Sequence, residues 1–185
     1  MTNRRLRRVL GLLPLALVLA LPAAPAQAGP TACAAADSSP VDASVAQLEH
    51  TVLCLVNRER TSRGLSRLRA NDRLERAARG HSRNMVARNF FAHDSLGGAS
   101  VLDRVKRRGY RSSGRLMVGE NIAWGSGSYA TPAEIVDGWM NSSGHRANIL
   151  HRAWDEIGVG VAVGAPRPTH GQPAATYTTD FGARG

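Results

Sequence analysis

The chain has 185 residues and a formal net charge of +10, and aromatic residues make up 5% of it. This length fits a single domain with its own core. Ten arginines lie between Arg58 and Arg88, spread around two predicted helices with few aromatic residues between them, which argues against specific nucleic-acid binding. A solvated helix surface is the simpler interpretation. Loose, salt-sensitive attraction to anionic surfaces is the open alternative.

Residues 1–28 are typical of a cleavable export signal. Four arginines between positions 4 and 8 precede an apolar run from Leu10 to Leu21, and Ala26-Gln27-Ala28 gives a small-x-small cleavage pattern. A membrane anchor is the weaker alternative, because the run is broken by Pro14 and is shorter than the roughly 20 residues of a spanning helix. Cleavage would remove the four arginines and leave a net charge of about +6. We therefore expect a secreted, extracellular protein without a transmembrane segment, either released or held at the cell wall.

The chain contains two cysteines, Cys33 and Cys54. Outside the cytosol they are more often bridged than free, and neither has a second metal ligand close by in sequence, so we expect a disulfide. A bridge that closes a loop of about 20 residues stabilises a fold by roughly 3 kcal/mol in the chain-entropy model. It would tie residues 29–40, an Ala, Pro and Ser-rich segment that we expect to be a flexible leader, to the domain at 41–185.

Two longer helices are expected in the first half of that domain. Apolar residues spaced by three and four predict a helix from residue 41 to Gly64; they are Val41, Val45, Leu48, Val52 and Val56. A second helix is expected to begin at Asp72, with Glu75 in the position of a reciprocal cap. Its buried stripe would consist of Leu74, Ala78, His81 and Met85. A short helical turn is expected over residues 100–108.

The second half alternates between strands and short helices. A strand is expected over residues 117–124, and a helix begins at Thr131-Pro132, where a capping Thr precedes a Pro at the first helical position. A short helix follows at 145–151, and alternation over 157–163 and 175–181 predicts a hairpin. Together these elements predict the α+β class, as a three-layer α-β-α sandwich with a small, mostly antiparallel central sheet.

Glu120 is the residue that the strand pattern singles out. Alternation places it on the same face as Val118, Ile122 and Trp124. A carboxylate on an apolar face must find a partner or raise its pKa. A structural carboxylate and a functional one are equally compatible with this pattern.

Two histidines are natural partners for Glu120. His93 follows the second helix in a loop, and His145 lies at the expected start of a short helix, where the helix end disfavours the charged imidazolium. Their spacing matches no local metal-binding motif. His81, in contrast, is expected to be a buried core histidine.

Several motifs in one order resemble a known family, the CAP superfamily of cysteine-rich secretory, antigen-five and pathogenesis-related proteins, in its compact bacterial branch. The motifs are Leu55-Val56-Asn57-Arg58-Glu59-Arg60, Phe90-Phe91-Ala92-His93-Asp94-Ser95, Gly119-Glu120-Asn121-Ile122-Ala123, Trp139 to Leu150 with Gly144-His145 at its centre, Ile157-Gly158-Val159-Gly160, and Tyr177-Thr178-Thr179-Asp180-Phe181-Gly182. The resemblance implies an α-β-α sandwich with a central cavity, lined in metal-binding members by two histidines and two glutamates.

Carried over, the resemblance assigns His93 and His145 as metal ligands, with zinc as the expected ion, and Glu120 as the first glutamate. Ser142 stands where the second glutamate should be, so the set is incomplete. We expect a secreted binding module whose cavity, lined by His93, Glu120, Ser142 and His145, holds a divalent metal, a lipid or another small extracellular ligand. One alternative is a metal-dependent hydrolase of extracellular or cell-wall substrates, with Glu120 as the catalytic base. The other is a surface or adhesion scaffold without chemistry.

Overall fold

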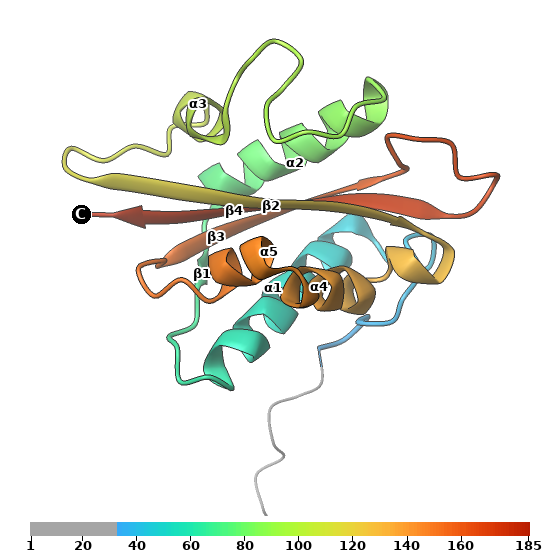
Figure 1. The fold of residues 1–185 in the computed structure, drawn as a ribbon, viewed down its shortest axis with the longest axis horizontal. Helices are drawn as coiled ribbons and strands as arrows, with labels where there is room; N and C mark the ends of the chain where they lie inside the picture. Colours follow the sequence, from blue (N-terminus) through green and yellow to red (C-terminus); the bar gives the residue numbers. More distant parts are fainter. Residues whose placement is uncertain (1–32) are drawn as a thin grey trace, which may run out of the picture. The chain divides into compact units, whose positions relative to one another are not determined.

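The structure is a computed structural model that describes residues 33–185. The predicted export signal and the first residues of the leader lie outside the described residues. The described part forms three layers, with a central sheet between α2 and α3 on one face and α1, α4 and α5 on the other (Figure 1). The predicted α+β class and α-β-α sandwich are confirmed.

The elements follow the predicted order, with one added strand. In chain order they are α1 (Val45–Thr61), β1 (Arg69–Ala70), α2 (Asp72–Ala87), α3 (Val101–Arg107), β2 (Leu116–Ser126), a 3-10 turn (Gly127–Ala130), α4 (Pro132–Asn141), α5 (Ser143–Ile149), β3 (Glu156–Val163) and β4 (Ala174–Arg184). The sheet order is β1-β3-β4-β2. Strand β4 pairs antiparallel with both β3 and β2, whereas β1 pairs parallel with β3 over two residues.

The start of α1 corrects the sequence-based prediction. The helix begins at Val45 and not at Val41, because Ser44 and Gln47 form a reciprocal capping box there. Val41 lies outside the helix and is 64% exposed, although its spacing fitted the apolar stripe. Helix α2 begins at Asp72 as predicted, but its cap is Asn71, whose side chain accepts hydrogen bonds from the first turn. In both cases a polar residue just before the stripe sets the boundary.

Two glycines bring α2 into backbone contact with the sheet. A Cβ atom at Gly158 would lie 2.0 Å from the backbone nitrogen of Glu75, and one at Gly160 would lie 2.0 Å from that of Arg79. The bare face of β3 is therefore the surface on which α2 packs. This contact places Ser82 against the strand, where its hydroxyl donates to the carbonyl of Gly160 at 2.8 Å.

The predicted disulfide between Cys33 and Cys54 is present. It joins the turns of residues 33–44 to α1, and the hydroxyl of Thr51 adds a hydrogen bond to the carbonyl of Ala34. The flexibility of the leader stays a prediction. Within residues 33–185, no helix combines the length and the apolar character needed to cross a bilayer.

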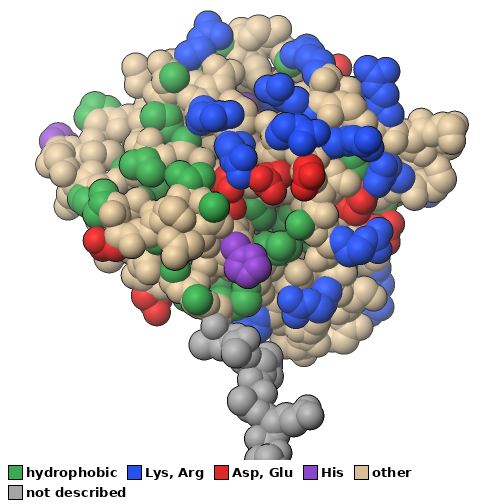
Figure 2. All heavy atoms as spheres, turned by 180° about the vertical axis from the view of Figure 1, so that it is seen from behind, with side chains coloured by type: hydrophobic (Ala, Val, Ile, Leu, Met, Phe, Trp, Pro, Cys, Tyr) green, Lys and Arg blue, Asp and Glu red, His purple; other side chains and the backbone are tan. Residues whose placement is uncertain are grey.

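Exposed basic side chains are numerous on α2 and α3. Figure 2 shows Lys and Arg side chains toward the top of the view, on the side of the sheet that carries α2 and α3, with a few acidic side chains among them. The exposed members on these helices are Arg73, Arg76, Arg83, Lys106 and Arg107. Their exposure matches the predicted solvated helix surface, and attraction to anionic surfaces stays a prediction.

Candidate functional site

Glu120 is the centre of a buried cluster on strand β2. Its side chain is 2% exposed, and its Oε1 accepts a hydrogen bond from Nδ1 of His93 at 2.8 Å. Its Oε2 forms an ion pair with the guanidinium of Arg104, and Nε2 of His81 lies 4.0 Å from the same oxygen. The carboxylate therefore faces the layer of α2 and α3. The guanidinium of Arg104 and the ring N–H of His93 compensate for the removal of this carboxylate from water.

Arg104 holds the loop that carries His93. Its Nη1 donates to the carbonyl of His93 at 2.7 Å and to that of Ala99 at 2.9 Å, while Nη2 pairs with Glu120. Helix α3 presents this arginine because Ser100 and Asp103 form a reciprocal cap at its first turn. Arg104 thus fixes both Glu120, which is the hydrogen-bond partner of the imidazole, and the backbone of His93.

The two predicted histidines differ in electrostatic state. The side chain of His93 is 57% exposed, and its hydrogen bond to Glu120 raises the pKa of the imidazole. Because Nδ1 donates to the carboxylate, Nε2 is the nitrogen left for a ligand. Burial lowers the pKa of His145, and the charge of His93 adds to this effect. The structure therefore brings one histidine that favours the charged form near one that favours the neutral form.

Helix α5 is attached to β2 beside Glu120. The amide of Asn148 donates to the carbonyl of Glu120 at 3.0 Å and to Oδ1 of Asn121 at 2.9 Å. The amide of Asn121 in turn donates to the carbonyl of His145 at 3.1 Å. These hydrogen bonds hold His145 beside strand β2.

A cleft of about 400 Å³ opens at this edge. Its walls are mostly aromatic and apolar, with Ser142 and His145 on one side; they include Phe91, Ile122, Trp124, Tyr129 and Trp139. His93 and Glu120 do not line the cleft, but Phe91 and Ile122, two residues from each of them in sequence, do. Of the four residues predicted to line one cavity, two line this cleft and two form the adjacent hydrogen-bonded pair.

The donor set does not match a resident zinc site. Within residues 33–185, no three His, Cys, Asp or Glu side chains lie close enough together to hold a metal ion. Both oxygens of Glu120 are engaged by His93 and Arg104, which leaves the imidazoles of His93 and His145 as donors. Protein zinc sites use three or four protein ligands. Metal binding by the two histidines stays a prediction, and no step is assigned to a metal.

Sequence reasoning missed Arg104 and Asp180. Arg104 was one arginine among many in the sequence, and its burial, at 8% exposure, is seen only in the structure. Asp180 pairs with Glu120 across β2 and β4 and is fully buried. An acidic residue inside a predicted alternating strand was the signal that could have found it. The predicted burial of His81 is confirmed, and its Nε2 bonds to the carbonyl of Ala92 at 3.0 Å.

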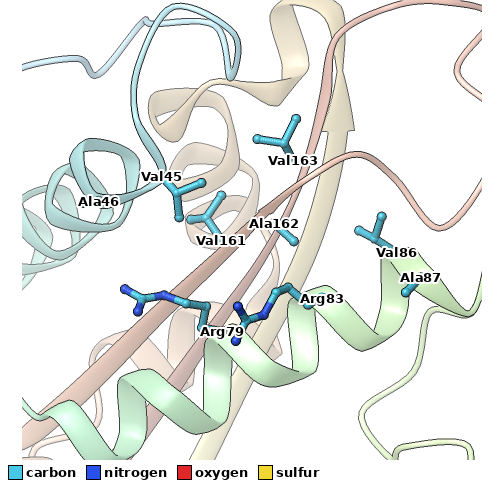
Figure 3. Close-up of a pocket in the computed structure, with 9 residues that line it drawn as sticks. All are labelled: Val45, Ala46, Arg79, Arg83, Val86, Ala87, Val161, Ala162 and Val163. Carbon is cyan, nitrogen blue, oxygen red and sulfur yellow. The ribbon is translucent and has the colours of Figure 1, made fainter.

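A larger hollow lies at the opposite edge of the sheet, and we call it the apolar groove. It has a volume of about 710 Å³ and is lined by Val45 and Ala46 of α1, Arg79, Arg83, Val86 and Ala87 of α2, and Val161, Ala162 and Val163 of β3 (Figure 3). It exists because β1 pairs only with the first two residues of β3, so the rest of that strand has no neighbour on this side. The 51% exposure of Val163 reflects this opening.

The two arginines of the groove are in different states. Arg79 donates to Glu49 and Glu75, and Glu49 also accepts a hydrogen bond from the backbone nitrogen of Val161 at 3.1 Å. Within the described residues no carboxylate pairs with Arg83, which is exposed. The groove therefore combines apolar walls with one uncompensated positive charge.

Curated proteins share this domain within longer chains. The Bacillus subtilis protein YkwD is 41% identical over 119 residues, which is 63% of this chain and 43% of YkwD. The membrane protein YlbC of the same organism is 35% identical over 113 residues, which is 61% of this chain and 31% of YlbC. The chain thus spans less than half the length of either relative.

Solved structures share the fold. An extracellular protein with an SCP domain from Bacillus anthracis superposes with a TM-score of 0.60 at 26% identity, over 76% of this chain and 44% of that one. An outer surface protein of Borrelia burgdorferi gives a TM-score of 0.61 at 20% identity, over 77% of this chain and 97% of that one. The family profile described as the cysteine-rich secretory protein family, CAP, matches residues 53–178, a range that contains His93, Glu120 and His145. The resemblance seen in the sequence is confirmed, and the chain belongs to the CAP family of cysteine-rich secretory proteins.

Proposed function

We propose that this CAP domain is an extracellular binding module that takes up an amphipathic anion, with the ligand's apolar chain in the apolar groove and its anionic head at Arg83. The observation that carries the proposal is the groove itself. It has a volume of about 710 Å³, its walls are mostly Val and Ala side chains, and it lies beside an arginine without a carboxylate partner in the described chain. A single alkyl chain with a carboxylate head has this combination of properties.

The size and the lining of the groove support this choice. Small-molecule sites typically measure about 300–1,000 Å³ and are mainly apolar, with a few polar groups that orient the ligand. Val161 and Val163 line the groove from β3, Val45 of α1 lies beside Val161, and Val86 of α2 lies at the other end of the groove (Figure 3). Burial of each CH₂ group contributes about 0.8 kcal/mol, so a chain that fills the groove gains affinity with length.

The charges favour an anion over a neutral ligand. Arg79 is paired with two carboxylates, which raise the pKa of its guanidinium, so its charge is already compensated and its side chain is held in place. Arg83 lies one turn further along α2 and is free to pair with a ligand. A carboxylate there would form a charge-assisted hydrogen bond.

A fluorescent fatty-acid probe tests the proposal directly. We expect the purified protein to bind the probe, and saturated fatty acids from C8 to C14 to displace it, with Kd tightening about fourfold per added CH₂ until the groove is full. The corresponding fatty alcohols should compete more weakly. No probe binding, or competition independent of chain length, would contradict the proposal and favour the scaffold hypothesis.

Variants locate the site. Ala87→Glu places a negative charge at an exposed helical position in the groove and should abolish probe binding, while Arg83→Gln should weaken fatty acids but not fatty alcohols. Arg88→Gln, at the exposed end of the same helix and outside the groove, is the matched control and should bind as the parent does. Equal loss in all three variants would place the site elsewhere.

A second candidate function is proton transfer at the His93–Glu120 pair, which lies next to the cleft beside β2. The observation that favours it is the His93–Glu120 hydrogen bond of 2.8 Å, in which a buried carboxylate orients a half-exposed imidazole. In that arrangement His93, through Nε2, is the group that can exchange a proton with a ligand, and Glu120 orients it. Hydrolysis of ester and peptidoglycan substrates that is lost in His93→Gln and retained in His151→Gln would support it. No turnover by the parent protein would exclude it for those substrates.

A further inference from the structure

We propose that Asp180 is a neutral carboxylic acid in the folded protein and that it donates its proton in a hydrogen bond to Glu120, which makes it a positioning residue of the His93 site. The cluster then contains two carboxyls, one charged and one protonated. The second carboxyl comes from strand β4 and not from position 142, where the chain has a serine.

The register of the sheet places the two carboxyls side by side. Glu120 on β2 is paired with Asp180 on β4, and Asp180 is paired with Gly158 on β3. Directly paired residues of an antiparallel sheet project to the same face. Because Gly158 has no side chain and packs against α2, Asp180 is covered by the helix and flanked by a single side chain in its row, that of Glu120.

Burial leaves Asp180 one way to satisfy its oxygens. The residue is 0% exposed, and no donor in residues 33–185 reaches either Oδ1 or Oδ2. An ionised carboxylate in this place would be buried, unsolvated and next to a second carboxylate. A protonated Asp180 needs an acceptor instead, and the carboxylate of Glu120, its directly paired neighbour on β2, is the acceptor that the sheet places beside it.

The surrounding charges agree with this assignment. Glu120 is held by Arg104 of α3 and by His93 of the loop after α2, so it is the member of the pair that carries the charge. His81 of α2 faces the same cluster, and burial lowers the pKa of its ring, so it supplies no compensating charge. Burial and the negative charge of Glu120 raise the pKa of Asp180 far more than Arg104 lowers it.

The assignment gives Glu120 three partners. His93 and Asp180 then approach one carboxylate from different elements, and Arg104 completes the set. Loss of the Asp180 donor would leave the charge on Glu120 less satisfied and would strengthen its attraction for the imidazolium of His93. Asp180 thus acts on the exposed imidazole without touching a ligand.

The first test measures stability against pH for the parent protein and for Asp180→Asn, whose amide keeps a donor but cannot ionise. An acid whose pKa is higher in the folded than in the unfolded state stabilises the fold below its unfolded pKa, and that stability is lost as pH rises toward the folded pKa. Between pH 4 and pH 7 we expect the unfolding constant of the parent, relative to that of Asp180→Asn, to rise about tenfold per pH unit. A ratio that stays constant over this range would overturn the proposal.

The second test does not depend on a variant. Carbon-13 NMR of Asp-labelled parent protein should show one carboxyl carbon that keeps the protonated chemical shift at pH 7. If every Asp carbon titrates in the ordinary acidic range, Asp180 is ionised and the proposal fails. As a positioning readout, the pKa of His93 should be higher in Asp180→Leu than in the parent and unchanged in Asp180→Asn. Equal values in all three proteins would show that Asp180 does not act on His93.

Discussion

At the scale of single residues, the His93 site depends on how one buried carboxylate is satisfied. Glu120 is almost fully enclosed, and a buried charge is tolerated only when it is paired and hydrogen-bonded. Arg104 supplies the paired positive charge for Glu120. The same guanidinium also binds two backbone carbonyls of the loop that carries His93. Removing one partner of a buried pair leaves the other charge uncompensated.

Arg104→Ala should therefore destabilise the fold severely. We expect a loss of about 3–5 kcal/mol in the free energy of unfolding, measured by urea denaturation, because Glu120 would remain buried without its guanidinium. Arg107→Ala, an exposed arginine three residues along the same helix, is the control and should stay within about 0.5 kcal/mol of the parent. Similar values for the two variants would show that the buried pair contributes little.

The pKa of His93 reports on Glu120. In the parent protein the hydrogen bond to Glu120 raises this pKa. In Glu120→Gln we expect it to fall, because a nearby opposite charge is lost. Side-chain NMR titration measures it, with the exposed His151 as the internal reference. The pair stabilises the fold below the ordinary His pKa, and this stability fades as pH rises through the raised one. An unchanged His93 pKa in the variant would contradict the pairing.

At the scale of elements, the contact between α2 and β3 sets how closely the layer of α2 and α3 approaches the sheet. The glycines of β3 let the backbone of α2 approach the strand. This close approach brings His81 and Ser82 to the sheet and places Asp180 under the helix. A side chain at Gly158 or Gly160 would push the helix outward. The arrangement of the Glu120 cluster therefore depends on residues that carry no chemistry.

Gly160→Ala tests this packing. The added Cβ would meet the backbone of Arg79 at 2.0 Å, so the helix must move, and we expect a loss of about 3 kcal/mol or more in the free energy of unfolding. Gly138→Ala in α4 is the matched control, because a Cβ there meets nothing within 4 Å. It should be neutral or stabilise by about 0.5–1 kcal/mol, as expected for a helical glycine. Thermal and urea unfolding of both variants give the comparison.

The sequence predicted most of these elements because their boundaries carry local signals. The Thr131-Pro132 start, the alternation of β3 and β4 and the stripe of α2 all depend on neighbouring residues, and each was found. Strand β1 was not predicted, since two exposed residues have no periodicity and pair only because the fold brings Ile157 to them. The start of α1 was misplaced, because the apolar stripe continues back to Val41, whereas the cap at Ser44 makes the helix begin at Val45.

At the scale of the whole molecule, the two hollows lie at opposite edges of one sheet. The strand order β1-β3-β4-β2 puts β2 at one edge, next to the aromatic cleft, and leaves most of β3 open at the other, next to the apolar groove. The His93–Glu120 pair could be anticipated from motifs that are each local in sequence. The groove could not, because it arises where a short strand fails to cover a long one between two helices.

The disulfide contributes to the stability of the whole domain. It joins residues 21 positions apart and fixes the entry segment to α1, so the paired substitution of Cys33 and Cys54 by Ala should lower the free energy of unfolding by about 3 kcal/mol. Urea unfolding of the double variant measures this, and the parent protein under reducing conditions is the matched comparison. If the free energy of unfolding fell in the reduced parent protein but not in the double variant, the result would contradict a stabilisation that comes from the cross-link alone.

The measurement that tests the account most directly is an NMR titration of the isotope-labelled protein with laurate. We predict saturable amide shifts concentrated at Val45, at Arg83 to Ala87 and at Val161 to Val163, with the residues around Glu120 unchanged. Shifts confined to Phe91, Trp124 and His145 would instead place the ligand in the cleft beside β2. The absence of any saturable shift would contradict a binding module for amphipathic anions.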